Sequence, residues 1–163
     1  MTKLLHYGFH PWTTGVHFAE SAEVQGWRVL ASRPGDHIRV SKQPNLDGYV
    51  WIDSGSYPLD AHKSPAPTCG YLIDVHLNRT IHLLQAAVFD IVFIAQKDYL
   101  DEFRSVNPNT YWLPLAAPAS FITAEREPSI EVGFVGNVRP NSRRERVLEA
   151  LEKRFTMNDW RRN

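Results

Sequence analysis

The sequence predicts an α/β fold in which a parallel sheet carries helices on both of its faces. Short apolar runs alternate with segments of helical periodicity along the whole chain. The runs are continuously apolar, which is typical of strands covered on both sides. Residues 91–95 are the clearest case, because every position is apolar. Strands that alternate with helices in this way favour a Rossmann-like parallel sheet.

The first half of the chain contains three predicted strands and one predicted helix. Thr14 is expected to cap the helix, Val16, Ala19 and Ala22 form its apolar side, and Gly26 is expected to end it. The predicted strands are residues 3–9, 27–32 and 48–52, and the helix covers residues 14–25.

The second half continues the alternation. Asn78 is expected to cap a helix that turns Ile81, Leu84 and Val88 inward. A short helix follows with Tyr99, Leu100 and Phe103 on its buried side. The predicted strands of this half are residues 69–73, 91–95 and 111–115.

A new structural unit is predicted to open near the end of the chain. Residues 130–137 combine a buried strand with a glycine turn, and Ser142 with Glu145 three places later forms a capping box. The helix that follows has an apolar stripe of Val147, Leu148, Leu151 and Phe155. We therefore expect a first domain at residues 1–128 and the truncated start of a second at 129–163.

Composition narrows the range of partners and compartments. Lys plus Arg equal Asp plus Glu, so the global charge gives no case for nucleic acid, although residues 139–163 carry eight basic against four acidic residues. Cys69 is the only cysteine, which excludes an intrachain disulfide and favours a reducing compartment. No apolar run reaches the length of a membrane span, and no signal peptide is apparent. The expected location is the cytoplasm.

Polar residues follow several predicted strands at their carboxyl ends, the edge at which parallel sheets bind ligands. This rule places His10, Asp53, Ser54 and Gln96 in one crevice, together with Asp74 and His76. For Asp53 and Ser54 a simple role in a turn is the alternative.

Asp74 and His76 are the candidate catalytic pair. In an extended segment residues two apart point the same way, and a carboxylate beside an imidazole suits proton abstraction from a hydroxyl. The alternative, left open by the sequence, is that Asp74 caps the next helix while His76 packs at its start.

Two further kinds of site were considered. The histidine spacing matches no zinc signature, so no protein-bound metal is expected. Gly136, Asn137 and Arg139 precede a helix whose first turn offers N–H groups to a phosphate. A tight turn with exposed arginines is the alternative reading of this segment.

Four runs in series resemble the glycosyltransferases related to the spore-maturation CgeB-like proteins, which have the GT-B architecture. The resemblance covers roughly residues 48–155. The four runs are YLIDVH (71–76), FDIVFIAQKDY (89–99), YWLPLA (111–116) and VGFVGN (132–137) followed by Arg143 and Arg144.

The resemblance implies two Rossmann-like domains that face each other across a cleft. It places Asp53, Asp74 and His76 on the acceptor side, and Gly136, Asn137 and Arg139 near the diphosphate of a nucleotide-sugar donor, which is a substrate rather than a cofactor. The acceptor is unknown. Most of the donor-binding domain has no counterpart here, so we expect this chain to be inactive alone, or active beside a separate C-terminal half. The apolar stripe of the last helix also predicts association, as a homodimer or with such a half.

Two other interpretations remain open at this stage. One is a non-enzymatic module that binds a glycan or a protein. The other is an unrelated flavodoxin-like or sugar-isomerase-type domain, which a single continuous sheet including the last strand–helix unit would favour.

Overall fold

The chain divides into two compact units, Met1–Phe121 and Ile122–Asn163. The computed structural model describes residues 4–8, 14–32, 46–53, 63–64, 66–117, 130–134, 136 and 138–159. The predicted boundary after residue 128 lies outside these residues, so the assignment of domains at 1–128 and 129–163 stays a prediction.

The first unit contains a six-stranded sheet in which every neighbouring pair is parallel. The strand order is β2-β1-β3-β4-β5-β6. The predicted fold class, an α/β protein with a Rossmann-like parallel sheet, is confirmed. The strands are β1 (Leu4–Gly8), β2 (Arg28–Ser32), β3 (Gly48–Ile52), β4 (Thr68–Leu72), β5 (Ile91–Ile94) and β6 (Thr110–Trp112).

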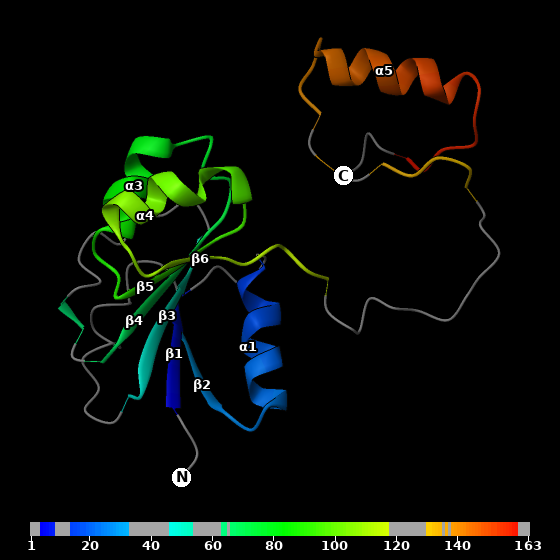
Figure 1. Cartoon of the computed structure of the whole chain (residues 1–163). Coiled ribbons are helices and arrows are strands. Elements are labelled where there is room, and N and C mark those ends of the chain that lie inside the picture. The colour runs from blue at the N-terminus through cyan, green and yellow to red at the C-terminus, as the bar shows by residue number, and fades with distance from the viewer. Residues whose placement is uncertain are drawn as a thin grey trace. The chain divides into compact units, whose positions relative to one another are not determined.

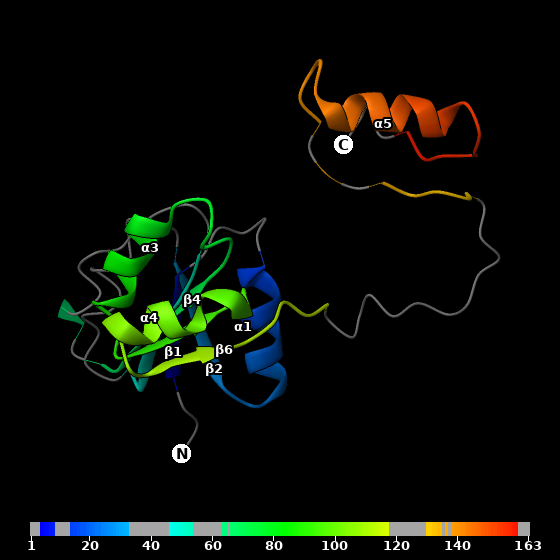
Figure 2. The ribbon, with the colours of Figure 1, turned by 45° about the horizontal axis from the view of Figure 1, so that its top comes forward.

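Helices cover both faces of the sheet, as predicted. Helix α1 lies on one face, and α3 and α4 lie next to each other on the other (Figures 1 and 2). Consecutive side chains of a strand point to opposite faces of the sheet. Trp51 packs in the core under α3 and α4, while Ile52 packs in the core under α1. The first-unit helices are α1 (Gly15–Val24), α3 (Arg79–Ala86) and α4 (Leu100–Val106), with a 3₁₀ turn, η2, at Lys97–Tyr99.

Helix α1 begins without the predicted cap. Thr14 has helical backbone angles and its side chain makes no capping hydrogen bond, so the cap prediction is wrong. Ala19 and Ala22 are buried, as predicted. Gly26 has φ +79°, a left-handed conformation that glycine adopts without steric cost, and it follows the end of the helix as predicted.

Helix α3 presents a different side to the core from the predicted one. Its buried residues are His82, Gln85 and Ala86, whereas Ile81 and Leu84 are exposed. Asn78 precedes the helix but makes no side-chain cap. The predicted inward face is therefore wrong for Ile81 and Leu84, whereas Val88, just after the helix, packs partly buried against the core.

Helix α4 behaves as its sequence predicts. Phe103 is fully buried, and Tyr99 and Leu100 pack partly buried against the same core. After the helix, buried Asn107 donates from Nδ2 to the backbone carbonyls of Ala86 at 2.9 Å and Phe89 at 2.7 Å. Asn107 thereby ties the end of α3 to the turn that leads into β6.

The second unit contains helix α5 (Arg143–Glu152). Ser142 Oγ accepts the backbone N–H of Glu145 at 3.1 Å, which confirms half of the predicted capping box. The Glu145 carboxylate accepts from the N–H of Asn141 rather than from that of Ser142. Leu148 is buried, while Val147 and Phe155 are exposed.

In the described part of residues 130–137, where a strand and a glycine turn were predicted, the strand is reduced to one parallel bridge between Val132 and Met157. Asn158 supports it, because its side chain donates to the carbonyl of Phe134 at 2.7 Å and accepts the Phe134 N–H at 2.8 Å. The described part of this unit adds no strand to the six-stranded sheet. No helix among the described residues is long and apolar enough to cross a membrane.

Candidate functional site

The carboxyl edge of the sheet brings together polar side chains from adjacent strands. The strand order reverses between β1 and β3, and in doubly wound sheets ligands bind beside such a reversal. Asp53 follows β3, Asp74 lies two residues beyond β4, and Gln96 lies two residues beyond β5. Two further residues predicted at this edge, His10 and Ser54, lie outside the described residues.

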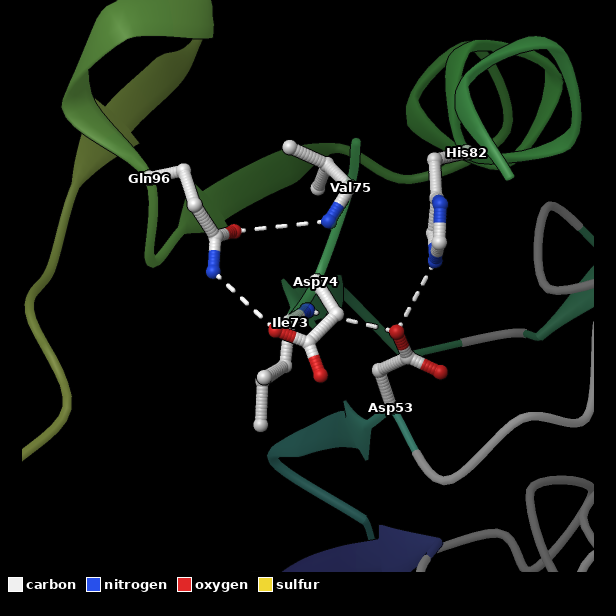
Figure 3. Close-up of polar contacts among 6 residues, drawn as sticks. All are labelled: Asp53, Ile73, Asp74, Val75, His82 and Gln96. Carbon is white, nitrogen blue, oxygen red and sulfur yellow. Dashed lines mark hydrogen bonds and ion pairs between the residues drawn. The ribbon is translucent and has the colours of Figure 1, made fainter. Parts of the chain in front are cut away.

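Asp53 is a buried carboxylate that accepts hydrogen bonds from different elements. Its Oδ2 accepts the backbone N–H of Ile73 at 3.2 Å and a hydrogen bond from His82 Nε2 at 2.9 Å (Figure 3). The side chains of Asp53 and His82 are only 6% and 4% exposed. A buried carboxylate needs such partners, because leaving it without them costs several kcal/mol. Asp53 therefore links the ends of β3 and β4 to α3.

Asp74 is the exposed carboxylate of this edge. Its φ of +54° is left-handed, a conformation that Asp and Asn adopt more readily than other non-glycine residues. Gln96 spans the turn: its amide nitrogen donates to Asp74 Oδ1 and its amide oxygen accepts from the N–H of Val75, both at 3.4 Å (Figure 3). The carboxylate of Asp74 is thus presented to solvent beside an amide that contacts the same turn.

His76 is exposed, but not in the geometry that the sequence predicted. Residues 75–77 form a turn, in which the N–H of Leu77 donates to the carbonyl of Asp74 at 2.9 Å. The segment is therefore not extended, and the argument that Asp74 and His76 point the same way is wrong. The catalytic role assigned to the two residues stays a prediction.

His82 belongs to this site, whereas the sequence drew attention to it only as one of the histidines whose spacing matches no zinc signature. It lies 29 positions after Asp53, and nothing in the local pattern of α3 marks it as the partner of a carboxylate. The one available signal was a histidine flanked by Ile81 and Leu83, a pattern that also fits an ordinary surface position.

The predicted phosphate-binding segment has its own internal contacts. Gly136 has φ +154°, a conformation that other residues rarely adopt, so the backbone there favours glycine whether or not a phosphate binds. Arg139 is exposed, and its carbonyl accepts the N–H of Ser142 at 3.2 Å. Asn137 lies outside the described residues. The Glu145 carboxylate also occupies the first turn of α5, where it would repel a phosphate.

The described residues hold neither a metal site nor a reactive thiol. No three His, Cys, Asp or Glu side chains gather there as metal ligands. Burial raises the pKa of the Cys69 thiol from 9.0 to about 12, which disfavours the reactive thiolate.

Comparison with known proteins returned no match to a protein-family model, to a curated protein or to a solved structure.

Proposed function

We propose that the first unit is the acceptor-binding domain of a GT-B glycosyltransferase, with the acceptor hydroxyl bound at the carboxyl edge of the sheet. Two lines support this proposal. The motif series at residues 71–137 resembles CgeB-like enzymes, and polar side chains gather at the edge where parallel sheets bind ligands.

The observation that carries the proposal is the conformation of Asp74. An exposed carboxylate on a left-handed residue, contacted by Gln96, has the chemistry to accept a hydrogen bond from a hydroxyl. Non-glycine residues with positive φ cluster at ligand sites, where the surrounding structure holds them. In the transfer step the acceptor oxygen forms a bond to the anomeric carbon as the bond to the nucleoside diphosphate breaks. The acceptor proton passes to Asp74, which acts as general base.

Asp53 and His82 act as positioning residues in this scheme. Asp53 accepts the N–H of Ile73, the residue directly before Asp74, and His82 holds Asp53 from α3. Because both side chains are buried, they fix the backbone of the turn without contacting the acceptor. His76, exposed in the next turn, is proposed to contact the acceptor as a second polar group.

Donor binding is assigned to the second unit only by resemblance. Gly136, Asn137 and Arg139 would lie near the diphosphate of the nucleotide sugar, and a homodimer or a separate C-terminal half would complete the site. Loop N–H groups and an arginine are suited to phosphate, because both donate to anionic oxygens.

A non-enzymatic module that binds glycan or protein is the second candidate. The observation in its favour is the Glu145 carboxylate in the first turn of α5, where a donor phosphate would have to bind. In that case the edge around Asp74 would bind a hydroxyl-rich ligand while sugar nucleotides would not bind.

The experiment is a binding measurement on the full chain against an array of neutral oligosaccharides. We expect the Asp74→Asn variant to bind about tenfold more weakly than wild type, since a hydrogen bond to a charged group contributes roughly 1.5–3 kcal/mol. The matched control is Asp47→Asn, an exposed carboxylate just before β3 and therefore near the opposite edge of the sheet.

Two outcomes separate the candidates. Affinity for a uridine, guanosine or thymidine diphosphate sugar favours the transferase, and glycan binding without it favours the binding module. No binding to any oligosaccharide, or equal binding by Asp74→Asn and wild type, would contradict both the transferase and a glycan-binding module, and would leave a protein ligand as the form of the second candidate that stands. Measured hydrolysis or transfer of a nucleotide sugar by the isolated chain would refute the expectation that it is inactive alone.

A further inference from the structure

Trp112 is an exposed aromatic residue that the fold holds in place. It ends β6, the last strand in the order of the sheet, and is 44% exposed. Its indole Nε1 donates to the carbonyl of Ala95 at 3.2 Å, and Lys97 Nζ lies 5.0 Å from the centroid of the ring. A ring that is already ordered loses little conformational entropy when a ligand packs against it, so it is suited to binding.

Two consecutive residues connect Trp112 with Asp74. The amide nitrogen of Gln96 donates to Asp74 Oδ1 at 3.4 Å (Figure 3), while Lys97 lies over the Trp112 ring. These contacts join the carboxyl ends of β4, β5 and β6, which are neighbours in the sheet. We call Asp74, Gln96, Lys97 and Trp112 the edge row.

Both ends of the edge row belong to the same side of the sheet. Ala95 and Leu113 pack against the core under α1. Gln96 has an extended backbone and follows Ala95, and Trp112 comes directly before Leu113. Because successive side chains of an extended chain point to opposite faces, Gln96 and Trp112 lie on the face of α3 and α4.

The register of the strands gives the length of the edge row. Leu72 pairs with Ile94, and Ile94 pairs with Trp112. Adjacent strands lie about 4.8 Å apart, so Trp112 is about 10 Å from β4 across the sheet. Asp74 lies two residues beyond the end of β4. A ligand that contacts both Asp74 and Trp112 must therefore be longer than one sugar ring, and two linked rings have a suitable length.

The chemistry of the edge row fits a saccharide. A sugar ring carries hydroxyls around its rim and C–H groups on its faces. The Asp74 carboxylate and the Gln96 amide can hydrogen-bond hydroxyls, and the flat indole of Trp112 can pack against a C–H face. The row has one acidic and one basic side chain, Asp74 and Lys97, so its charges balance and do not favour a strongly charged ligand.

We propose that the acceptor contains at least two linked sugar rings, with the reacting hydroxyl at Asp74 and the neighbouring ring stacked on Trp112. This inference rests on the proposed function, because it takes Asp74 as the site of the acceptor hydroxyl. It adds a specificity-determining residue: Trp112 selects a disaccharide or longer chain over a monosaccharide.

The test is the affinity of the full chain for neutral mono-, di- and trisaccharides of the common hexoses and N-acetylhexosamines. Wild type should bind its best disaccharide about tenfold more tightly than the constituent monosaccharides, and Trp112→Ala should lose this advantage. The matched control is Trp27→Ala, because Trp27 is 40% exposed and directly precedes β2, at the opposite edge of the sheet. That variant should bind the disaccharide like wild type.

Tryptophan fluorescence gives an answer even if Trp112→Ala fails to fold. The disaccharide should shift the emission of wild type and of Trp27→Phe with a saturable dependence on concentration. Trp112→Phe keeps an aromatic ring, so it should still bind the disaccharide but show a much smaller shift in emission.

The outcomes separate this inference from the proposed function. Equal affinity for mono- and disaccharides, or disaccharide binding that Trp112→Ala leaves unchanged, would overturn the role of Trp112 while Asp74 remains the hydroxyl site. If Asp74→Asn bound the disaccharide like wild type, the proposed function would fail, and the position of the first ring with it. No binding of any saccharide would overturn both.

Discussion

At the scale of single residues, the candidate site depends on one buried carboxylate. Asp53 Oδ2 receives hydrogen bonds from the backbone of Ile73 and from His82. The two donors come from different elements, so the carboxylate sets the position of the turn at Asp74 relative to α3. Removing it would leave the part-buried N–H of Ile73 and the buried imidazole of His82 without this acceptor.

The Asp53→Ala substitution is therefore expected to lower the free energy of unfolding by about 2–4 kcal/mol. Urea denaturation followed by circular dichroism measures this change. Glu23→Ala, which removes an exposed carboxylate from α1, serves as control and should stay within about 0.5 kcal/mol of wild type. A loss in Asp53→Ala no larger than in the control would contradict the structural role.

Cys69 gives a second residue-scale prediction. The residue as a whole is half-buried, but burial raises the pKa of its thiol from 9.0 to about 12. A difference of about three pKa units reduces the thiolate fraction about a thousandfold, so alkylation at pH 8 should be far slower in the folded chain than in urea. Equal alkylation rates in the folded and unfolded chains would show that the thiol is not desolvated.

The same shift has a consequence for stability. The pKa of the Cys69 thiol is higher in the folded chain than in the unfolded chain. Its contribution to the free energy of unfolding is therefore fully present below pH 9.0 and is lost as the pH rises towards about 12. Replacing Cys69 by alanine should remove this part of the loss of stability at alkaline pH. The midpoint of denaturation should therefore fall less between pH 8 and pH 11 in Cys69→Ala than in wild type.

At the scale of elements, strands were easier to predict than helix faces. Residues 48–52 were predicted as a strand, and β3 has those bounds. Continuous apolar runs identify strands because both faces of the sheet are covered. The face of α3 was predicted from its aliphatic residues, but His82 and Gln85 are the buried ones. Asp53 and Asn107 determine that orientation, and tertiary partners of this kind leave no trace in the local pattern.

The close approach of β4 to the segment after α3 gives a prediction at this scale. A Cβ at Gly70 would lie 2.7 Å from the Phe89 ring, inside contact distance. Phe89 is buried in the core and has little room to move. Gly70→Ala should therefore lower the free energy of unfolding of the first unit by about 1–3 kcal/mol, as measured by urea denaturation.

The control for this substitution is Gly133→Ala. Among the described residues, a Cβ at Gly133 would meet Ile130, at an ordinary contact distance of 3.6 Å. This variant should unfold within about 0.5 kcal/mol of wild type. If Gly70→Ala were as stable as Gly133→Ala, Phe89 would have to be less tightly packed than the structure indicates.

At the scale of the whole molecule, topology explains which parts of the site were predictable. Parallel strands end at one edge, so the gathering of Asp53, Asp74 and Gln96 followed from the fold class alone. The left-handed conformation of Asp74 did not follow from the sequence. The second unit was predicted as a strand and a helix, and its strand proved to be a single bridge between Val132 and Met157.

The central claim is that a hydroxyl-bearing acceptor binds at this edge of the sheet, around Asp74. The most direct test is a titration of the ¹⁵N-labelled full chain with the neutral oligosaccharide that binds best, followed by amide NMR shifts. We predict that the amides of Ile73, Val75 and Gln96 shift in wild type and much less in Asp74→Asn, while those flanking Asp47 do not shift. Saturating shifts confined to other parts of the chain would contradict the account.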